Sequence, residues 1–204
     1  MREESPLATD YRRLTENLSR FYDFTDKVVL FVGAAGRQLL DPTTRVRKLI
    51  AIDKDLEALR RLKAEIDSKG LQNRVEVVGA NFEEVATHGD AVYFEFCLHE
   101  MDDPQKTLSH AKSLASDIVV YDHSPGSEWI YYGAEEAKVA RSSAVIERIG
   151  IRRRQAFRGE QRFASFAELL SKVRPQGPLA LERAQRFAGS PEIVIPMSYE
   201  LNLL

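Results

Sequence analysis

Short apolar runs alternate with amphipathic stretches along the first 121 residues of the chain. Each run is rich in β-branched residues and too short for a helix, which is typical of a buried strand. Between the runs, apolar residues recur at helical steps, as they do where a helix buries one face. The pattern predicts strands at 27–32, 48–52, 75–78, 91–96 and 117–121, and helices at 5–24, 56–66 and 104–114. Strands and helices that alternate in this way form a parallel sheet with right-handed crossovers, so we predict a doubly wound α/β fold.

The remainder of the chain has a different pattern. Residues 122–175 include an Ala-, Glu- and Lys-rich stretch, and we expect them to form a helical excursion over the active edge of the sheet. Two β-like runs follow at 181–187 and 192–201, and the turn-rich link between them predicts a terminal antiparallel hairpin. We predict a single domain over 1–204, with 1–26 as an N-terminal helical cap.

Composition and charge narrow the range of partners. The 204 residues carry 29 Lys and Arg against 31 Asp and Glu, so the net charge of −2 provides no overall field for nucleic acid or an anionic membrane surface. The longest apolar runs have about five residues, far fewer than a membrane span needs. The single cysteine, Cys97, excludes an internal disulfide and fits a reducing compartment. We therefore expect a cytoplasmic monomer or homodimer that acts on a small molecule and does not bind membrane, with nucleic acid as a disfavoured partner.

The turn after the first predicted strand carries the first chemical signal. Gly33 and Gly36 frame this turn, and glycines there let a ligand approach the backbone at the start of a helix. Asp53 follows 20 positions after Gly33, where nucleotide-binding folds place an acid that accepts from ribose hydroxyls. The two signals together predict a nucleoside ligand. Segment 33–37 lacks a third glycine at the offset of the dinucleotide fingerprint, which makes an NAD-type oxidoreductase the less favoured alternative.

Four segments of the chain resemble the class I S-adenosylmethionine-dependent methyltransferases. They are VLFVGAAG at 29–36, LIAID at 49–53, VVGANF at 77–82 and FCLHEM at 96–101. The resemblance implies a Rossmann-like sheet of seven strands whose last strand is antiparallel. It also implies S-adenosylmethionine as the cofactor and methyl transfer to a small-molecule acceptor that the sequence does not identify.

The resemblance further implies which residues bind the cofactor. They are Gly33, Ala34, Ala35, Gly36, Asp53, Lys54, Asn81, Phe82, Phe96 and Cys97. The glycine turn would pass under the methionine and the ribose, and Asp53 would accept from the ribose hydroxyls. Asn81 stands where the family usually has an aspartate, and its side-chain oxygen can also accept from the adenine amino group. Phe82 would cover the adenine ring, while Phe96 and Cys97 would offer backbone groups to the amino-acid end.

Three positions depart from the family pattern. Phe31 stands where an acid usually anchors the ammonium group of the cofactor, and Ala35 and Arg37 replace a richer glycine motif. Arg37 is either a contact for the carboxylate of the cofactor or a solvated side chain. These departures keep a second function open, in which the chain binds a nucleoside and acts as a regulatory protein with weak or absent catalysis.

Two histidines follow the fourth and fifth predicted strands. His99 and His123 are expected at the same edge of the sheet, and imidazole titrates near neutral pH, so each is a candidate base that removes a proton from the acceptor. Each has an acid beside it, Glu100 or Asp122. These four side chains could also ligate a metal, but the chain has neither a histidine pair at i, i+4 nor an H-E-x-x-H motif, so we predict no metal site.

A cluster of arginines precedes the C-terminal part of the chain. It consists of Arg152, Arg153, Arg154, Arg158 and Arg162. A solvated face is the first interpretation, and an anionic partner or RNA are the alternatives, because guanidinium groups pair well with carboxylate and phosphate.

Overall fold

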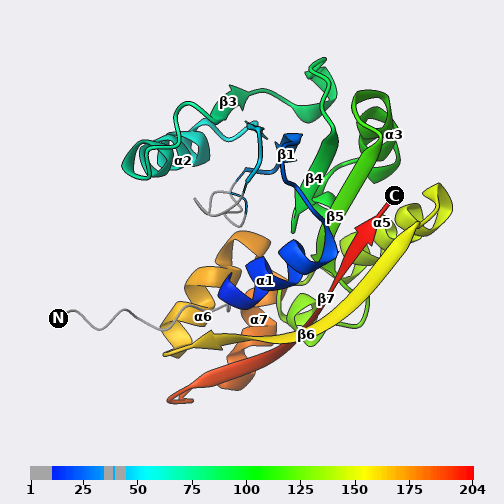
Figure 1. The fold of residues 1–204 in the computed structure, drawn as a ribbon. Coiled ribbons are helices and arrows are strands. Elements are labelled where there is room, and N and C mark those ends of the chain that lie inside the picture. The colour runs from blue at the N-terminus through cyan, green and yellow to red at the C-terminus, as the bar shows by residue number, and fades with distance from the viewer. Residues whose placement is uncertain (1–10, 35–38, 40–44) are drawn as a thin grey trace.

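The computed structural model describes residues 11–34, 39 and 45–204, and Figure 1 shows its fold. The strands are β1 (Val28–Val32), β2 (Lys48–Asp53), β3 (Val75–Gly79), β4 (Ala91–Glu95), β5 (Asp117–His123), β6 (Arg153–Phe163) and β7 (Ile193–Leu203). The helices are α1 (Tyr11–Phe21), α2 (Leu56–Ser68), α3 (Pro104–Leu114), α4 (Glu128–Tyr132), α5 (Glu136–Ile149), α6 (Phe166–Val173) and α7 (Pro178–Ala184). The described residues form one seven-stranded sheet in the order β3-β2-β1-β4-β5-β7-β6. Strands β1 to β5 run parallel, and β7 is antiparallel to both of its neighbours.

Side chains that alternate along the parallel strands build two hydrophobic cores. Val29 and Phe31 of β1 belong to the core that α1 and α2 cover, while Leu30 and Val32 belong to the core that α3 and α5 cover. Figure 1 shows α1 and α3 on opposite sides of the sheet. Because the strands are buried on both faces, they are apolar along their whole length, and the sequence pattern identifies them.

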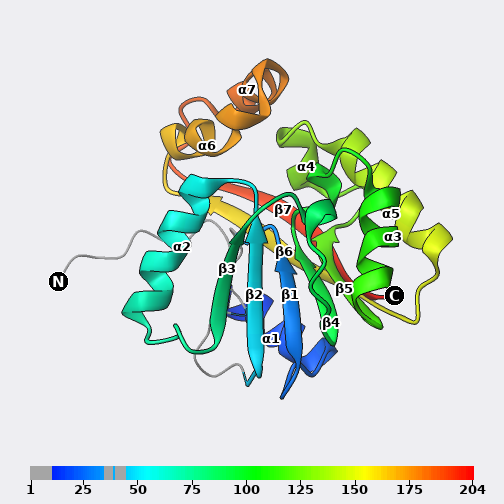
Figure 2. The same ribbon diagram turned by 90° about the horizontal axis from the view of Figure 1, so that it is seen from above.

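Helices α4, α6 and α7 form a cap beyond the carboxyl ends of the parallel strands, where Figure 2 shows α6 and α7 above the arrowheads. Helix α4 packs on β7 and α7, and α6 packs on α7. Helices α4, α5 and α6 all fall within 122–175, so this region contains the predicted helices, but it also contains β6. Across the part of the chain that the structure describes, every helix is too short or too polar to span a lipid bilayer.

The prediction of a terminal hairpin was wrong about its first strand, residues 181–187. The run 181–187 is helical, because α7 starts at Pro178, continues through good helix formers and passes into a 3₁₀ turn at Gln185–Phe187. The antiparallel partner of β7 is instead β6, in the segment that we predicted to be helical. Strand β6 lies at the sheet edge and exposes most of its side chains, so its polar sequence contains no apolar run.

The predicted cap over 1–26 falls partly outside the described residues. Within them, α1 buries Leu14 and Phe21 against the sheet. The Asn17 amide nitrogen also donates to the Tyr199 hydroxyl at 3.0 Å, which ties α1 to β7. Helix α1 therefore covers a face of the sheet, and Leu14 reaches the cavity described below.

Candidate active site

A cavity of about 960 Å³ lies at the carboxyl ends of the parallel strands. It joins most of the predicted cofactor residues to both predicted catalytic histidines: Gly33, Asp53, Lys54, Asn81, Phe82, Phe96, Cys97, His99 and His123 line it. Ala34 is buried and does not contribute to this lining. The predicted contacts Ala35 and Gly36, together with Arg37, lie outside the described residues. Residues assigned separately along the sequence thus meet in one cavity.

Gly33 occupies a position where no side chain fits. Its φ is +71°, and a Cβ atom there would lie 2.7 Å from both Cβ and Sγ of Cys97. The Cys97 thiol donates to the Val32 carbonyl at 3.2 Å, and burial raises the pKa of this thiol well above its usual range. Cys97 is therefore a neutral side chain packed against the glycine turn and not a thiolate nucleophile.

Asp53 and Asn81 supply hydrogen-bond acceptors at one end of the cavity. Asp53 ends β2, and its Oδ1 accepts from the Asp55 backbone N–H at 2.9 Å, which orients the carboxylate. Asn81 donates through Nδ2 to Glu84 Oε1 at 3.1 Å, so its side-chain carbonyl keeps its acceptor capacity. This pair of acceptors suits a ribose diol and an exocyclic amine.

Packing restricts the side chains of two predicted cofactor contacts, Phe82 and Phe96. The Phe82 ring is 4% exposed and packs edge-on against Phe94 and His110, so only a small part of it faces the cavity. Phe96 has a φ of +47°, which is rare for an aromatic residue, and its ring lies 4.9 Å from the His123 ring between centroids. Strained backbone of this kind clusters at ligand sites.

Glu95 lines the cavity, and the sequence analysis missed it. It is the last residue of β4, is 5% exposed, and accepts from the Tyr93 hydroxyl at 3.1 Å. Phe31 pairs with Tyr93 in the parallel register, so Glu95 lies further along the neighbouring strand on the same face. An acid inside the apolar run 91–96 is the signal that could have identified it, because acids are rarely buried without a specific reason.

His99 is held by the carboxylate of Asp122. A short 3₁₀ turn after β4 carries His99, and Asp122 lies near the end of β5. His99 Nδ1 lies 2.6 Å from Asp122 Oδ1, and the His99 backbone N–H donates to Oδ2 at 3.1 Å. The backbone N–H of His123 also donates to Oδ1, at 2.8 Å. A carboxylate at Nδ1 favours the tautomer whose free lone pair is on Nε2.

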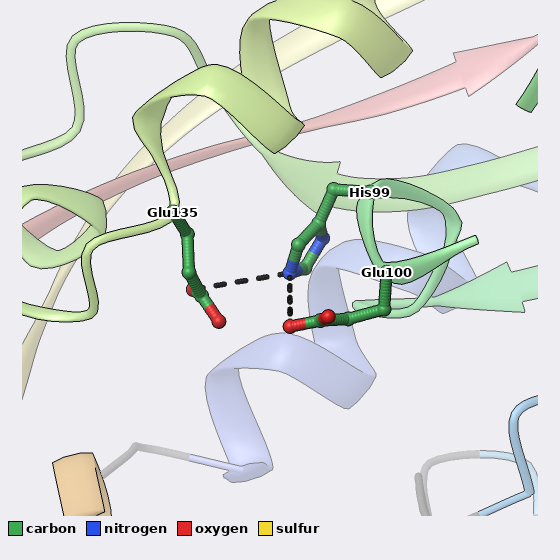
Figure 3. Close-up of side chains that lie close together, drawn as sticks. All are labelled: His99, Glu100 and Glu135. Atoms are coloured by element: carbon green, nitrogen blue, oxygen red, sulfur yellow. Dashed lines mark ion pairs between the residues drawn. The ribbon is translucent and has the colours of Figure 1, made fainter. Parts of the chain in front are cut away.

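Two further carboxylates approach His99 Nε2, as Figure 3 shows. Glu100 Oε1 is 3.6 Å away, and Glu135 Oε2 is 3.8 Å away. Lys138 pairs with the other oxygen of Glu100 at 2.6 Å. The sequence analysis missed Glu135, because an acid before a helix is ordinary and only the packing of α5 brings it to His99.

The two histidines differ in their protonation. Burial lowers the pKa of His99, but the hydrogen bond and charge of Asp122 and the charges of Glu135 and Glu100 outweigh this effect and raise the pKa above its usual value. Burial lowers the pKa of His123 to about 4, so this ring is neutral at physiological pH and a weak base. Burial and a hydrogen bond with Glu100 raise the pKa of Glu135 to about 7.

No protein-family model and no curated protein matches the sequence of this chain. Solved structures match it over most of its length. A SAM-dependent methyltransferase from Aquifex aeolicus is 18% identical with a TM-score of 0.62, and the match covers 96% of this chain and 89% of that one. The YcgJ protein from Bacillus subtilis is 14% identical with a TM-score of 0.67, and the match covers 94% and 98% of the two chains. Precorrin 8w decarboxylase from Methanobacterium thermoautotrophicum is 16% identical with a TM-score of 0.59, and the match covers 98% of this chain and 91% of that one.

These matches agree with the topology of the sheet. Five parallel strands, an antiparallel β7 inserted between β5 and β6, and a cavity at the carboxyl ends of the strands are all present. The predicted seven-stranded Rossmann-like sheet is thereby confirmed. The chain has the fold of the class I S-adenosylmethionine-dependent methyltransferases.

Proposed function

We propose that this protein binds S-adenosylmethionine in the cavity and transfers its methyl group to a small-molecule acceptor. The observation that carries the proposal is that one cavity joins the glycine turn and Asp53 to the buried His99–Asp122 pair. Its volume of about 960 Å³ is at the upper end for small-molecule sites, which leaves room for an acceptor beside the cofactor.

Each part of the cofactor has a chemically matched group in the cavity. Asp53 accepts from the ribose hydroxyls, and Asn81 accepts from the adenine amino group. Glu95 supplies the negative charge for the ammonium group, in place of the acid that the family usually carries at Phe31. The cofactor supplies an electrophilic methyl group when bound, and the protein contributes mainly the alignment of the acceptor.

The acceptor is assigned to the part of the cavity under the cap, where Trp129 and Lys172 contribute to the lining. His99 lies in the turn after β4, two residues beyond the predicted cofactor contact Cys97, and is oriented by Asp122. We therefore assign activation of the acceptor to His99. His123, neutral and poorly basic, is assigned to contact with the acceptor rather than to removal of its proton.

A nucleoside-binding regulatory protein on the same scaffold is the second candidate. The observation that favours it is Phe31, which is fully buried and stacks on Tyr93 where the family has an acid. One structural neighbour is named a decarboxylase, so the fold does not by itself specify methyl transfer.

Calorimetric titration with S-adenosylmethionine, S-adenosylhomocysteine and NAD tests the cofactor assignment. We expect the two sulfur compounds to bind and NAD not to bind. Asp53→Ala should weaken binding by roughly 1.5–3 kcal/mol, about 10- to 150-fold, because a charged hydrogen bond to the ribose is lost. Asp67→Ala, on an exposed part of α2, is the matched control and should bind like the wild type.

Two outcomes would change the assignment. Binding of NAD alone would contradict the proposal. Binding of S-adenosylmethionine without methyl transfer to any of a set of phenols, amines and carboxylates would favour the regulatory protein.

A further inference from the structure

Three potential ligand atoms converge beside the acceptor space: His99 Nε2, Glu100 Oε1 and Glu135 Oε2 (Figure 3). The two carboxylate oxygens lie 3.6 and 3.8 Å from the nitrogen, and all three atoms lie within 4.8 Å of one another. A tetrahedral site with bonds of about 2.1 Å places its ligand atoms about 3.4 Å apart. The observed separations from Nε2 exceed this spacing only slightly, so small side-chain rotations would close a cation site.

His99 is oriented as a ligand histidine usually is. The Asp122 carboxylate binds Nδ1 at 2.6 Å and the backbone N–H of His99 at 3.1 Å. The lone pair of the neutral ring therefore lies on Nε2, the atom that faces both glutamates. A carboxylate at the far nitrogen fixes the tautomer and raises the basicity of a metal-bound histidine.

The two glutamates are also held in place. Lys138 pairs with the Glu100 oxygen that does not face His99, so the facing oxygen is directed toward Nε2. Glu135 is 5% exposed, faces the His99 ring and shares a hydrogen bond with Glu100. A divalent cation that bound here would displace the proton held between the two carboxylates and compensate their charge.

Two further observations concern the surroundings of the three ligand atoms. His123 Nδ1 is buried without a hydrogen-bond partner among the described residues, and its ring lies 5.5 Å from that of His99 between centroids. A buried polar atom of this kind calls for a water or a ligand. The described lining of the cavity also contains eight carboxylates and three lysines, so its field favours a positive charge.

We propose that His99, Glu100 and Glu135 bind one first-row divalent metal ion, Zn²⁺ or Mn²⁺, with Asp122 as a positioning residue. One imidazole and two carboxylates are donors that both ions accept. Three protein ligands leave the ion open positions toward the cavity, which is the arrangement of catalytic rather than structural sites. We predicted no metal site from the sequence because it has neither a histidine pair at i, i+4 nor an H-E-x-x-H motif, and Glu135 lies 35 positions after Glu100.

The role of the ion rests on the proposed function. An acceptor hydroxyl that contacts the ion releases its proton to solvent more readily, because the positive charge stabilises the oxyanion. The oxygen lone pair then forms the new C–O bond while the C–S bond of the cofactor breaks and its electron pair stays on sulfur. His99 activates the acceptor through the ion and does not itself take the proton.

Calorimetric titration of the chelator-treated full chain with ZnCl₂ or MnCl₂ tests the site. We expect one ion to bind per chain, and Glu135→Gln and Glu100→Gln each to lower the affinity at least 10-fold. Asp122→Asn should lower it about 10- to 100-fold, as the loss of a carboxylate behind a ligand histidine usually does. Glu136→Gln is the matched control, because Glu136 adjoins Glu135 in the chain but pairs with Arg183 at 2.6 Å.

The outcomes separate the metal site from the proposed function. Failure of the wild type to bind either ion stoichiometrically, or equal affinity in the wild type and the Glu100 and Glu135 variants, overturns the metal site. Circular dichroism checks that each variant folds, and Glu100→Gln, at a half-exposed position, gives the same test if the Glu135 variant does not fold. S-adenosylhomocysteine is titrated into the same samples. Ion binding without nucleoside binding contradicts only the proposed function. Nucleoside binding without ion binding contradicts only the metal site.

Discussion

At the scale of single residues, the buried carboxylate of Glu95 lines the cavity from β4, the strand that pairs with β1. Phe31 of β1 is buried in the apolar core and stacks on Tyr93 with 5.3 Å between ring centroids. Tyr93 in turn donates to Glu95, which reaches the cavity. An acid at position 31 would be costly in this apolar core, whereas Glu95 can meet a cationic ligand. In the proposed function, Glu95 of the neighbouring strand therefore provides the anchoring charge.

Glu95→Gln should weaken S-adenosylmethionine binding by roughly 1.5–3 kcal/mol, because the amide keeps the shape of the side chain but loses its charge. Adenosine lacks the ammonium group and should bind the wild type and the variant equally. Calorimetry with both ligands measures the difference, and Glu76→Gln on the exposed strand β3 is the control. Equal losses for both ligands would show general damage to the cavity and would remove the assigned role of Glu95.

At the scale of elements, the arginine cluster belongs to the exposed edge strand β6 and the residue before it. Arg152 pairs with Asp117, Arg154 with Glu147 and Glu200, and Arg162 with Glu160 and Glu192. Charged side chains on an edge strand oppose edge-to-edge pairing with other chains. These ion pairs support the interpretation of the cluster as a solvated face.

Asp117 joins the end of α1 to β5 and β6, and its titration should affect the stability of the fold. It accepts from the Tyr22 hydroxyl at 2.5 Å and pairs with Arg152 at 2.7 Å. Burial raises the pKa of Asp117, but the hydrogen bonds from Tyr22 and Arg152 outweigh it and hold the pKa below its usual range. The folded pKa is below the unfolded one, so this stabilisation is present above pH of about 4 and is lost as the pH falls through the folded value.

Asp117→Asn should therefore lower the free energy of unfolding at pH 7 by about 1–3 kcal/mol. The difference between the variant and the wild type should shrink as the pH falls below about 4, because protonation removes the same charge from the wild type. Urea denaturation at pH 7 and at pH 3 measures both values. Asp67→Asn, at an exposed position, should change neither, and a difference that is independent of pH would refute the assigned role of Asp117.

At the scale of the whole molecule, the cavity is divided between two sets of elements. Strands β1 and β2 contribute Val32 and Asp53 to its lining, β5 and the cap contribute His123 and Trp129, and β4 lies between β1 and β5 in the sheet. The proposed function assigns the nucleoside to the first set and the acceptor to the second. Figure 2 shows the cap helices above these strand ends. Cofactor binding and acceptor activation should therefore respond to different substitutions.

His99→Ala should lower turnover about 10²- to 10⁴-fold, the usual contribution of a group that activates the acceptor. The affinity for S-adenosylhomocysteine should stay unchanged, because the proposed function assigns its binding to Asp53 and the glycine turn and not to His99. Single-turnover kinetics and calorimetry measure the two quantities, with His88→Ala at an exposed position as the control. Wild-type turnover in the His99 variant would exclude this residue from the mechanism.

The sequence by itself determined the parallel part of the sheet and which residues of its strand ends line the cavity. Strands that are buried on both faces must be apolar throughout, and the turn after such a strand needs a glycine where another chain segment packs closely, as Cys97 does on Gly33. Asp53 could be predicted to line the cavity because its position depends only on its place at the end of a strand. Burial of a strand, a glycine in the turn after it and an acid at a strand end are local properties, so short segments of the sequence predict them.

Only the tertiary structure decided how β7 is paired and how the acceptor end of the cavity is assembled. Strand β6 exposes most of its side chains, so its sequence resembles that of a solvated helix. Only the pairing with β7 identifies it as a strand. Glu135 lies 36 positions after His99, and nothing in its own neighbourhood distinguishes it from any acid before a helix. The packing of α5 on the turn after β4 brings the two side chains together, and contacts between distant parts of the chain leave no local pattern in the sequence.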